Sequence, residues 1–275
     1  MNMTKRPVWI IDTSLRDGIR TSGMQIDYDR KYAIAKTLVE IGVNEIEAGI
    51  PAEGREEKEF LHRLNEDFQD TVITAWCEGH VSHIQDALES SIESIHIAFP
   101  VSDVQLRLHG MSREDLLDSL DHVLCSALGN FSHISIGAQD ASRADADFLK
   151  LFIKSVGKYG VRRIRIADTT RIWDPPTTVR MIRDIKEYSG AFLEFHGHDN
   201  FGKASANAIS AIQAGADAVS TILGGLCDET GNTELEEFLI YLAFAGRHRA
   251  TIELENLLAI NTSLYQEEVG NVESW

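Results

Sequence analysis

Short runs of apolar and β-branched residues alternate with longer amphipathic stretches along the whole chain. The longer stretches place apolar residues at helical spacing. In residues 27–42, for example, Ile34, Leu38 and Ile41 recur on one face, and the stretch ends in Gly42, as helix C-termini often do. The short runs, which we expect to form strands, are 8–12, 45–50, 71–76, 94–99, 133–138, 161–167, 191–196 and 218–223.

Eight strand–helix units in roughly 250 residues are typical of a closed parallel barrel. An open doubly wound sheet usually has fewer strands and a glycine-rich phosphate turn, and no G-x-G-x-x-G follows the first run here. We therefore predict an α/β protein whose residues 1–250 form one closed eight-stranded parallel β/α (TIM) barrel. In that fold the chemistry lies at the C-terminal ends of the strands.

Composition narrows the possible partners. The formal net charge is −17, from 43 acidic and 26 basic residues, so the surface opposes binding to nucleic acid. The densest basic run, "VRRIRI" at 161–166, alternates with apolar residues and is expected to be a strand. No apolar run is long enough for a signal peptide or a membrane span. The three cysteines are few and widely spaced, which indicates a reducing, cytoplasmic compartment without membrane association.

The candidate chemistry centres on "HGHDNFG" at 196–202, which follows an expected strand. Alternate strand residues face the same side, so His196 and His198 can reach one cation while Gly197 faces away. Asp17, at the end of the first strand, faces the same mouth, and Arg16 beside it can pair with a carboxylate or enolate oxygen. Imidazole with carboxylate ligands suits a divalent cation such as Mg²⁺, Mn²⁺, Co²⁺ or Zn²⁺. Polar loop histidines are the alternative.

Other histidines carry weaker signals. Cys77, His80 and His83 have the spacing of metal ligands but lack a fourth, so a buried cysteine with two histidines at a helix start is favoured. His96 lies early in its strand, and we expect a structural role for it away from the mouth.

Several motifs together resemble a known superfamily. They are "IIDTSLRDG", "VNEIEAGIP", "IADTT", "EFHGHDNFGKASANAISAIQAGADAVSTI" and "TGN", within residues 8–265. The chain resembles the DRE-TIM metallolyases, which include the isopropylmalate, citramalate and homocitrate synthases and HMG-CoA lyase. The stretches "IHIAFPVSDVQL" and "IGAQDASRADADF" are most similar to the nitrogenase-associated homocitrate synthases.

The resemblance implies roles for individual residues. The family's metal ligands fall on Asp17, His196, His198 and Asn232. Its catalytic arginine falls on Arg16. A second set of positions follows from the same motifs: Glu47 would orient the arginine or a metal-bound water, and Thr169 would contact the substrate carboxylate.

The implied activity is an acyltransferase reaction, a metal-dependent condensation of acetyl-CoA with a 2-oxo acid. The implied cofactors are a divalent metal ion and acetyl-CoA as cosubstrate, and the implied assembly is a homodimer. Two alternatives stay open: a metal-dependent lyase or aldolase acting on a hydroxy acid, and the barrel subunit of a two-chain synthase in which a second polypeptide completes the site.

The sequence departs from the synthases near the expected metal. Ile19 and Arg20 replace a glutamate and a glutamine, and Gln139 stands where the homocitrate branch has a glutamate. We expect Arg16, Arg20 and Gln139 to contact the substrate together with Thr169. Arg20 would favour a substrate with an extra acidic group, unless it pairs with a local acid. In the last loop the altered residues are Cys227, Asp228 and Glu229.

The end of the chain departs as well. Residues 251–275 resemble the start of the linker helices that follow the barrel in synthases. The substrate, the general base and the preferred metal stay open.

Overall fold

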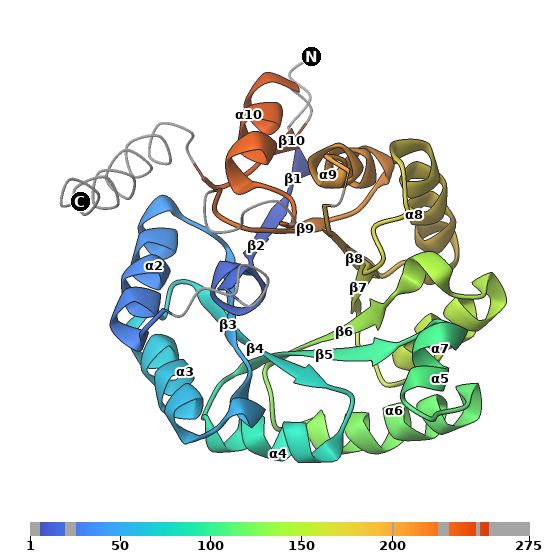
Figure 1. Ribbon diagram of the computed structural model, residues 1–275, viewed down its shortest axis with the longest axis horizontal. Coiled ribbons are helices and arrows are strands. Elements are labelled where there is room, and N and C mark those ends of the chain that lie inside the picture. The colour runs from blue at the N-terminus through green and yellow to red at the C-terminus, as the bar shows by residue number, and fades with distance from the viewer. Residues whose placement is uncertain (1–5, 20–25, 200, 225–230, 246–247, 253–275) are drawn as a thin grey trace, which may run out of the picture.

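The computed structural model describes residues 6–19, 26–199, 201–224, 231–245 and 248–252. Its centre is a closed barrel of parallel strands in sequence order, with β2 hydrogen-bonded to β9 (Figure 1). This confirms the predicted fold. The barrel strands are β2 (Trp9–Asp12), β3 (Glu45–Gly49), β4 (Val72–Glu78), β5 (Ser94–Pro100), β6 (His133–Gln139), β7 (Arg163–Asp168), β8 (Phe192–Gly197) and β9 (Ala218–Thr221).

Helices surround the barrel on the outside (Figure 1). Side-chain caps mark where several of them begin, as at Asp27, which accepts a hydrogen bond from the backbone N–H of Arg30 (2.8 Å). Gly42 ends the same helix at a φ of 89°, a conformation that side chains with a Cβ rarely adopt. The helices are α2 (Tyr28–Ile41), α3 (Arg55–Asp67), α4 (Val81–Glu89), α5 (Asp103–Leu108), α6 (Arg113–Ala127), α7 (Ala146–Lys158), α8 (Pro175–Ser189), α9 (Ala204–Ala214) and α10 (Leu235–Ala245).

Short elements complete the described chain. β1 (Arg6–Pro7) pairs with β10 (His248–Arg249) in a separate two-stranded sheet. Single turns η1 (Ser14–Gly18), η2 (Pro51–Glu53) and η3 (Ala141–Arg143) follow β2, β3 and β6. Among the described helices none is long and apolar enough to cross a membrane.

The apolar core lies between the strands and the helices, whereas the inside of the barrel is lined with charge. On β7, Ile164 and Ile166 are fully or almost fully buried in the apolar core, while the alternate residues Arg163 and Arg165 pair with carboxylates of β3 and β8. The basic run at 161–166 therefore forms a strand, as predicted, but its arginines belong to the interior. This charged interior lies directly beneath the candidate site.

Candidate metal centre

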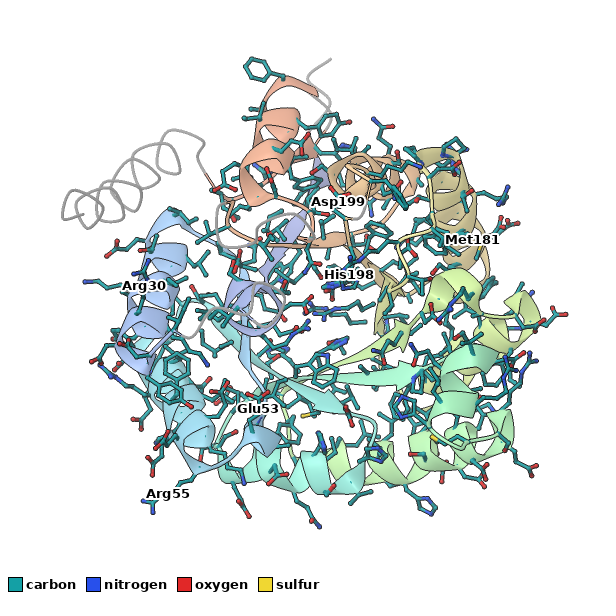
Figure 2. The ribbon with its side chains drawn as sticks, in the orientation of Figure 1. Arg30, Glu53, Arg55, Met181, His198 and Asp199 are labelled. Carbon is teal, nitrogen blue, oxygen red and sulfur yellow. The ribbon has the colours of Figure 1, made fainter. Side chains whose placement is uncertain are left out.

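Four predicted ligands come together at the C-terminal end of the barrel. Asp17 is in the turn η1 after β2, His196 is near the end of β8, and His198 follows that strand. Asn232 is brought alongside by an isolated antiparallel bridge to His198. Figure 2 shows His198 inside the barrel, whereas Arg30 and Met181 project from the outer helices.

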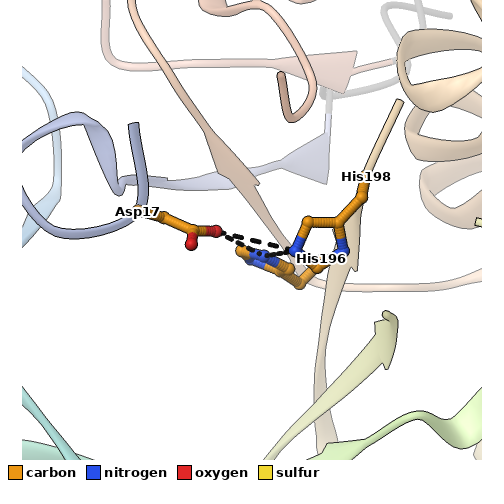
Figure 3. A group of neighbouring side chains, drawn as sticks. All are labelled: Asp17, His196 and His198. Carbon is orange, nitrogen blue, oxygen red and sulfur yellow. Dashed lines mark hydrogen bonds and ion pairs between the residues drawn. The ribbon is translucent and has the colours of Figure 1, made fainter. Parts of the chain in front are cut away.

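The side chains of three of these residues point at one another (Figure 3). Oδ2 of Asp17 lies 3.2 Å from Nε2 of His196 and 3.6 Å from Nε2 of His198, and the two Nε2 atoms are 3.3 Å apart. Nδ2 of Asn232 donates to the same Oδ2 at 2.7 Å. Within the described chain, Asp17, His196 and His198 are the cluster whose ligand atoms all fall within 4.8 Å.

Hydrogen bonds and burial fix the protonation of this cluster. Nδ1 of His198 lies 3.1 Å from the backbone oxygen of Asp168, which must be the acceptor, so Nδ1 carries the proton and Nε2 presents a lone pair. Burial lowers the pKa of His196 to about 4, and the hydrogen bond that its Nε2 donates to Oδ2 of Asp17 opposes this shift. Burial alone would raise the pKa of Asp17, but Arg16 and the two histidines hold it well below its usual value.

These residues fit a divalent cation. Oδ2 of Asp17, the Nε2 lone pair of His198 and Nε2 of His196 converge at short range, and carboxylate and imidazole groups are the ligands that such a cation prefers. Asn232 could add its amide oxygen, since amide orientation follows the hydrogen-bond network. The proton from Nδ1 of His198 to the backbone oxygen is the outer contact that metal-bound histidines usually make.

Arg16 joins this cluster to the barrel interior. Its Nη1 lies 2.8 Å from Oδ1 of Asp17, its Nε donates to Oε1 of Glu47 at 2.7 Å, and its Nη2 also pairs with that oxygen. The guanidinium lies 5.6 Å from the centre of the Trp76 ring, within cation–π range. Glu47 is thus a fully buried partner of Arg16 and not a surface carboxylate, and its role in orienting the arginine stays a prediction.

A pocket of about 240 Å³ opens beside these groups. Gln139 and Thr169, both predicted to contact substrate, line it, and Oγ1 of Thr169 also accepts the backbone N–H of Asp140 at 2.9 Å. His96 lines the same pocket, so its expected place away from the mouth was wrong. The pocket reaches down to His96 because the neighbouring strand carries Gly137, where an added Cβ would lie 2.6 Å from Nε2 of His96.

The structure adds charged residues that we did not select from the sequence. Arg165 also lines the pocket, and it bridges two buried carboxylates, Glu47 and Glu194. Below it, Arg163 bridges Glu194 and Glu45. The sequence signal for these residues is the R-I-R-I alternation of the strand. Because helices cover the outside of the barrel, the isoleucines face the helices and the arginines face inward.

The alternative cysteine–histidine cluster is structural. Cys77 is fully buried, and burial raises the pKa of its thiol, so it is neither exposed nor ionised as a ligand would be. Its Sγ contacts the backbone oxygen of His83 at 3.7 Å, and His80 lies at the start of α4. The predicted site residue Arg20 and the altered loop positions Cys227, Asp228 and Glu229 lie outside the described residues.

Comparison with known proteins decides the family. The model of the HMGL-like family matches residues 7–264. The chain belongs to this family. The resemblance to DRE-TIM metallolyases, inferred from the motifs, is thereby confirmed.

Two relatives of this HMGL-like chain show how far the similarity extends. The 2-isopropylmalate synthase 2 of Caldanaerobacter subterraneus subsp. tengcongensis is 34% identical over 264 residues, covering 95% of this chain but 66% of the relative. The homocitrate synthase subunit alpha of Clostridium pasteurianum is 32% identical over 251 residues, covering 90% of this chain and 93% of the relative. The chain thus spans about two thirds of the first relative and nearly all of the second.

Solved structures support the fold. An HMG-CoA lyase from Acenitobacter baumannii, solved in complex with coenzyme A and 3-methylmalate, superposes with a TM-score of 0.83 at 18% identity, covering 96% of this chain and 92% of that one. At this identity the likeness concerns the barrel alone.

Proposed function

We propose that the chain catalyses a metal-dependent, Claisen-type condensation of acetyl-CoA with a 2-oxo acid. The observation that carries this proposal is the convergence of Asp17, His196 and His198 on one point, with the guanidinium of Arg16 directly beside it. The synthase names of the relatives support the same class of reaction.

The charge of the site suits this substrate class. With both histidines binding as neutral imidazoles, the cluster would offer a cation one negative charge, on Asp17. A divalent cation would leave one net positive charge, which the carboxylate of a 2-oxo acid would neutralise. When bound, the metal ion (Mg²⁺, Mn²⁺, Co²⁺ or Zn²⁺) supplies Lewis-acid polarisation of the 2-oxo carbonyl.

In the proposed reaction the acetyl methyl group gives a proton to a base, and the resulting carbanion equivalent attacks the 2-oxo carbon. One C–C bond forms, and the carbonyl oxygen takes up negative charge and then a proton. Water then cleaves the thioester and releases the CoA thiol. Arg16, already fixed by Asp17 and Glu47, would face the oxygen on which the charge develops. Gln139 and Thr169 would hold the acid in the pocket, and Arg20 stays a predicted contact.

The test is CoA-thiol release by the purified protein with Mg²⁺ or Mn²⁺, acetyl-CoA and a panel of 2-oxo acids. We expect release that depends on one acid and is lost in Asp17→Asn, which keeps the shape of the side chain but not its charge. The same variant should lose metal binding, measured by calorimetry. Release that continues without metal or in Asp17→Asn would contradict the proposal.

A second candidate is the barrel subunit of a two-chain synthase. The observation that favours it is the relative named as a subunit alpha, 93% of which aligns with this chain. In that case the isolated chain binds metal but releases no thiol, and activity appears when a second polypeptide is added. Cleavage of a hydroxy acid in place of thiol release would instead identify a lyase. Homodimer formation and cytoplasmic location stay predictions.

A further inference from the structure

We infer that Arg165 is a positioning residue, which holds Glu47 from below and thereby aims Arg16 at the pocket. The inference rests on the proposed function of the site above it. It starts from Glu47, a fully buried carboxylate that is shared between two arginines.

Each oxygen of Glu47 serves a different arginine. Oε1 accepts from Nε and Nη2 of Arg16, and Oε2 accepts from Nη2 of Arg165 at 2.6 Å. Because a carboxylate is planar, holding Oε2 fixes the direction in which Oε1 faces. The orientation of Arg16 therefore depends on a residue that it does not contact.

Arg165 is itself held from the opposite side. Its Nε donates to Oε1 of Glu194 at 2.5 Å, and Oγ of Ser220 donates to that same oxygen at 2.6 Å. The other oxygen, Oε2, accepts from Nη2 of Arg163 at 2.8 Å. Arg165 is 2% exposed and Glu194 is fully buried, so neither can exchange these contacts for water.

Charge explains why the lower contact matters. Three buried glutamates, Glu45, Glu47 and Glu194, face Arg16, Arg163 and Arg165, so the interior is balanced. Without Arg165, Glu47 would keep Arg16 as its remaining cation and its Oε2 would be left unpaired. The pair would then be free to swing toward the vacated space, away from Asp17.

The chain offers a matched control two residues away on the same strand. Arg163 is half-buried at the lower end of the same interior, with its side chain 19% exposed, and also pairs with Glu194, but its other partner is Glu45, not Glu47. Arg163→Gln removes one arginine that pairs with Glu194, as Arg165→Gln does, and leaves both contacts of Glu47 in place.

The first experiment compares kinetics. In Arg165→Gln we expect kcat to fall about 100-fold, the effect of a small misplacement of a catalytic group, with KM for the 2-oxo acid and affinity for Mn²⁺ nearly unchanged. Arg163→Gln should keep most of kcat. A raised KM with normal kcat in Arg165→Gln would mean that Arg165 touches the substrate, and equal losses in both variants would mean a general structural role. Either result would overturn the inference.

A double variant tests whether Arg165 acts through Glu47. Glu47→Gln with Arg165→Gln should be no less active than Glu47→Gln alone, because the second residue then has nothing left to position. Additive losses would refute the link. The double variant removes one positive and one negative charge, so it leaves no unpaired buried charge at Glu47. It can therefore be measured even if Arg165→Gln alone does not fold. Arg165→Lys, which keeps the charge but lacks the planar fork, should lose about tenfold in kcat.

A third readout does not depend on turnover. In protein labelled with ¹⁵N-arginine, the Nε–H signal of Arg16 reports its bond to Glu47, and it is assigned by its loss in Arg16→Lys. We expect Arg165→Gln to shift that signal and Arg163→Gln to leave it in place. If the wild type releases no thiol, the proposed function fails while this measurement still decides the positioning role. An unshifted signal in Arg165→Gln would overturn the inference.

Discussion

The metal cluster (Asp17, His196, His198 and Asn232) and the ion-pair network beneath it (Glu45, Glu47, Glu194, Arg163 and Arg165) both contain buried carboxylates. The charges of these carboxylates are balanced in different ways. In the network, buried carboxylates alternate with arginines, and each of the two lower arginines bridges two carboxylates. In the cluster, Asp17 faces the Nε2 atoms of two histidines and shares its one arginine, Arg16, with Glu47. The described network is therefore balanced by its own arginines together with Arg16, whereas we propose that a cation completes the cluster. Substitutions in the first region should affect stability, and those in the second should affect binding.

The largest expected effect follows from breaking the network. Glu194→Gln leaves Arg163 and Arg165 facing a neutral side chain in a buried place, which we expect to cost about 3–5 kcal/mol of unfolding free energy. Urea unfolding of the metal-free protein measures this loss. Asp17→Asn is the comparison, and we expect a much smaller loss for it. Equal losses would remove the distinction between the two regions.

Metal binding should stabilise the protein through the cluster alone. At a free Mn²⁺ concentration 100 times Kd, linkage adds about 2.7 kcal/mol to the free energy of unfolding. Thermal unfolding with and without Mn²⁺ measures the gain. We expect the gain to vanish in Asp17→Asn and to persist in Arg163→Gln, which lies outside the cluster. A gain that survives in Asp17→Asn would place the cation elsewhere.

Another buried carboxylate, Asp12, shows what happens without an arginine. Its Oδ1 accepts the backbone N–H of Ser14 at 2.9 Å, and its Oδ2 has no hydrogen-bond partner among the described residues. Burial raises the pKa of Asp12 to about 7, whereas burial of Glu194 is outweighed by Arg165 and Arg163, which lower its pKa to about 2.

The sign of the pH dependence follows from this contrast. Folded Asp12 keeps its proton up to about pH 7, while the unfolded chain loses it near 3.8. Its contribution to stability is therefore present below pH 3.8 and is lost as the pH rises toward 7, by about 1.4 kcal/mol per pH unit. Urea titrations of the wild type and Asp12→Asn should differ by this slope. A difference that is constant with pH would contradict the assignment.

The smallest effect on metal affinity and stability is expected at the cluster of Cys77, His80 and His83, for which we do not propose metal binding. His80 is exposed at the start of α4, so His80→Ala should change neither Mn²⁺ affinity nor, beyond about 0.5 kcal/mol, the free energy of unfolding. Calorimetric titration with Mn²⁺ checks the first point. Loss of a binding equivalent would show that Cys77, His80 and His83 bind metal after all.

The sequence predicted the strands from local spacing, and the expected ligands from the H-x-H spacing, the strand ends and the family motifs. Period-two alternation places His196 and His198 on one side, and the end of the first strand brings Asp17 to the same mouth. The ion pairs of the network could not be predicted from the sequence because no motif links the residues that form them: Arg165 and Glu47 are 118 residues apart. The depth of the pocket at His96 depends on Gly137 of the neighbouring strand, which no pattern within one strand reveals.

The bond between Asp17 and Asn232 joins positions 215 residues apart, and it exists because β2 lies next to β9. The earliest and the last ligands along the chain are thus neighbours across the seam at which the barrel closes. During synthesis on the ribosome, a chain that has not yet produced its final strand can hold only part of the ligand set. If all four residues bind the proposed cation, full occupancy would therefore require that the seam has closed, and metal binding would report completed folding.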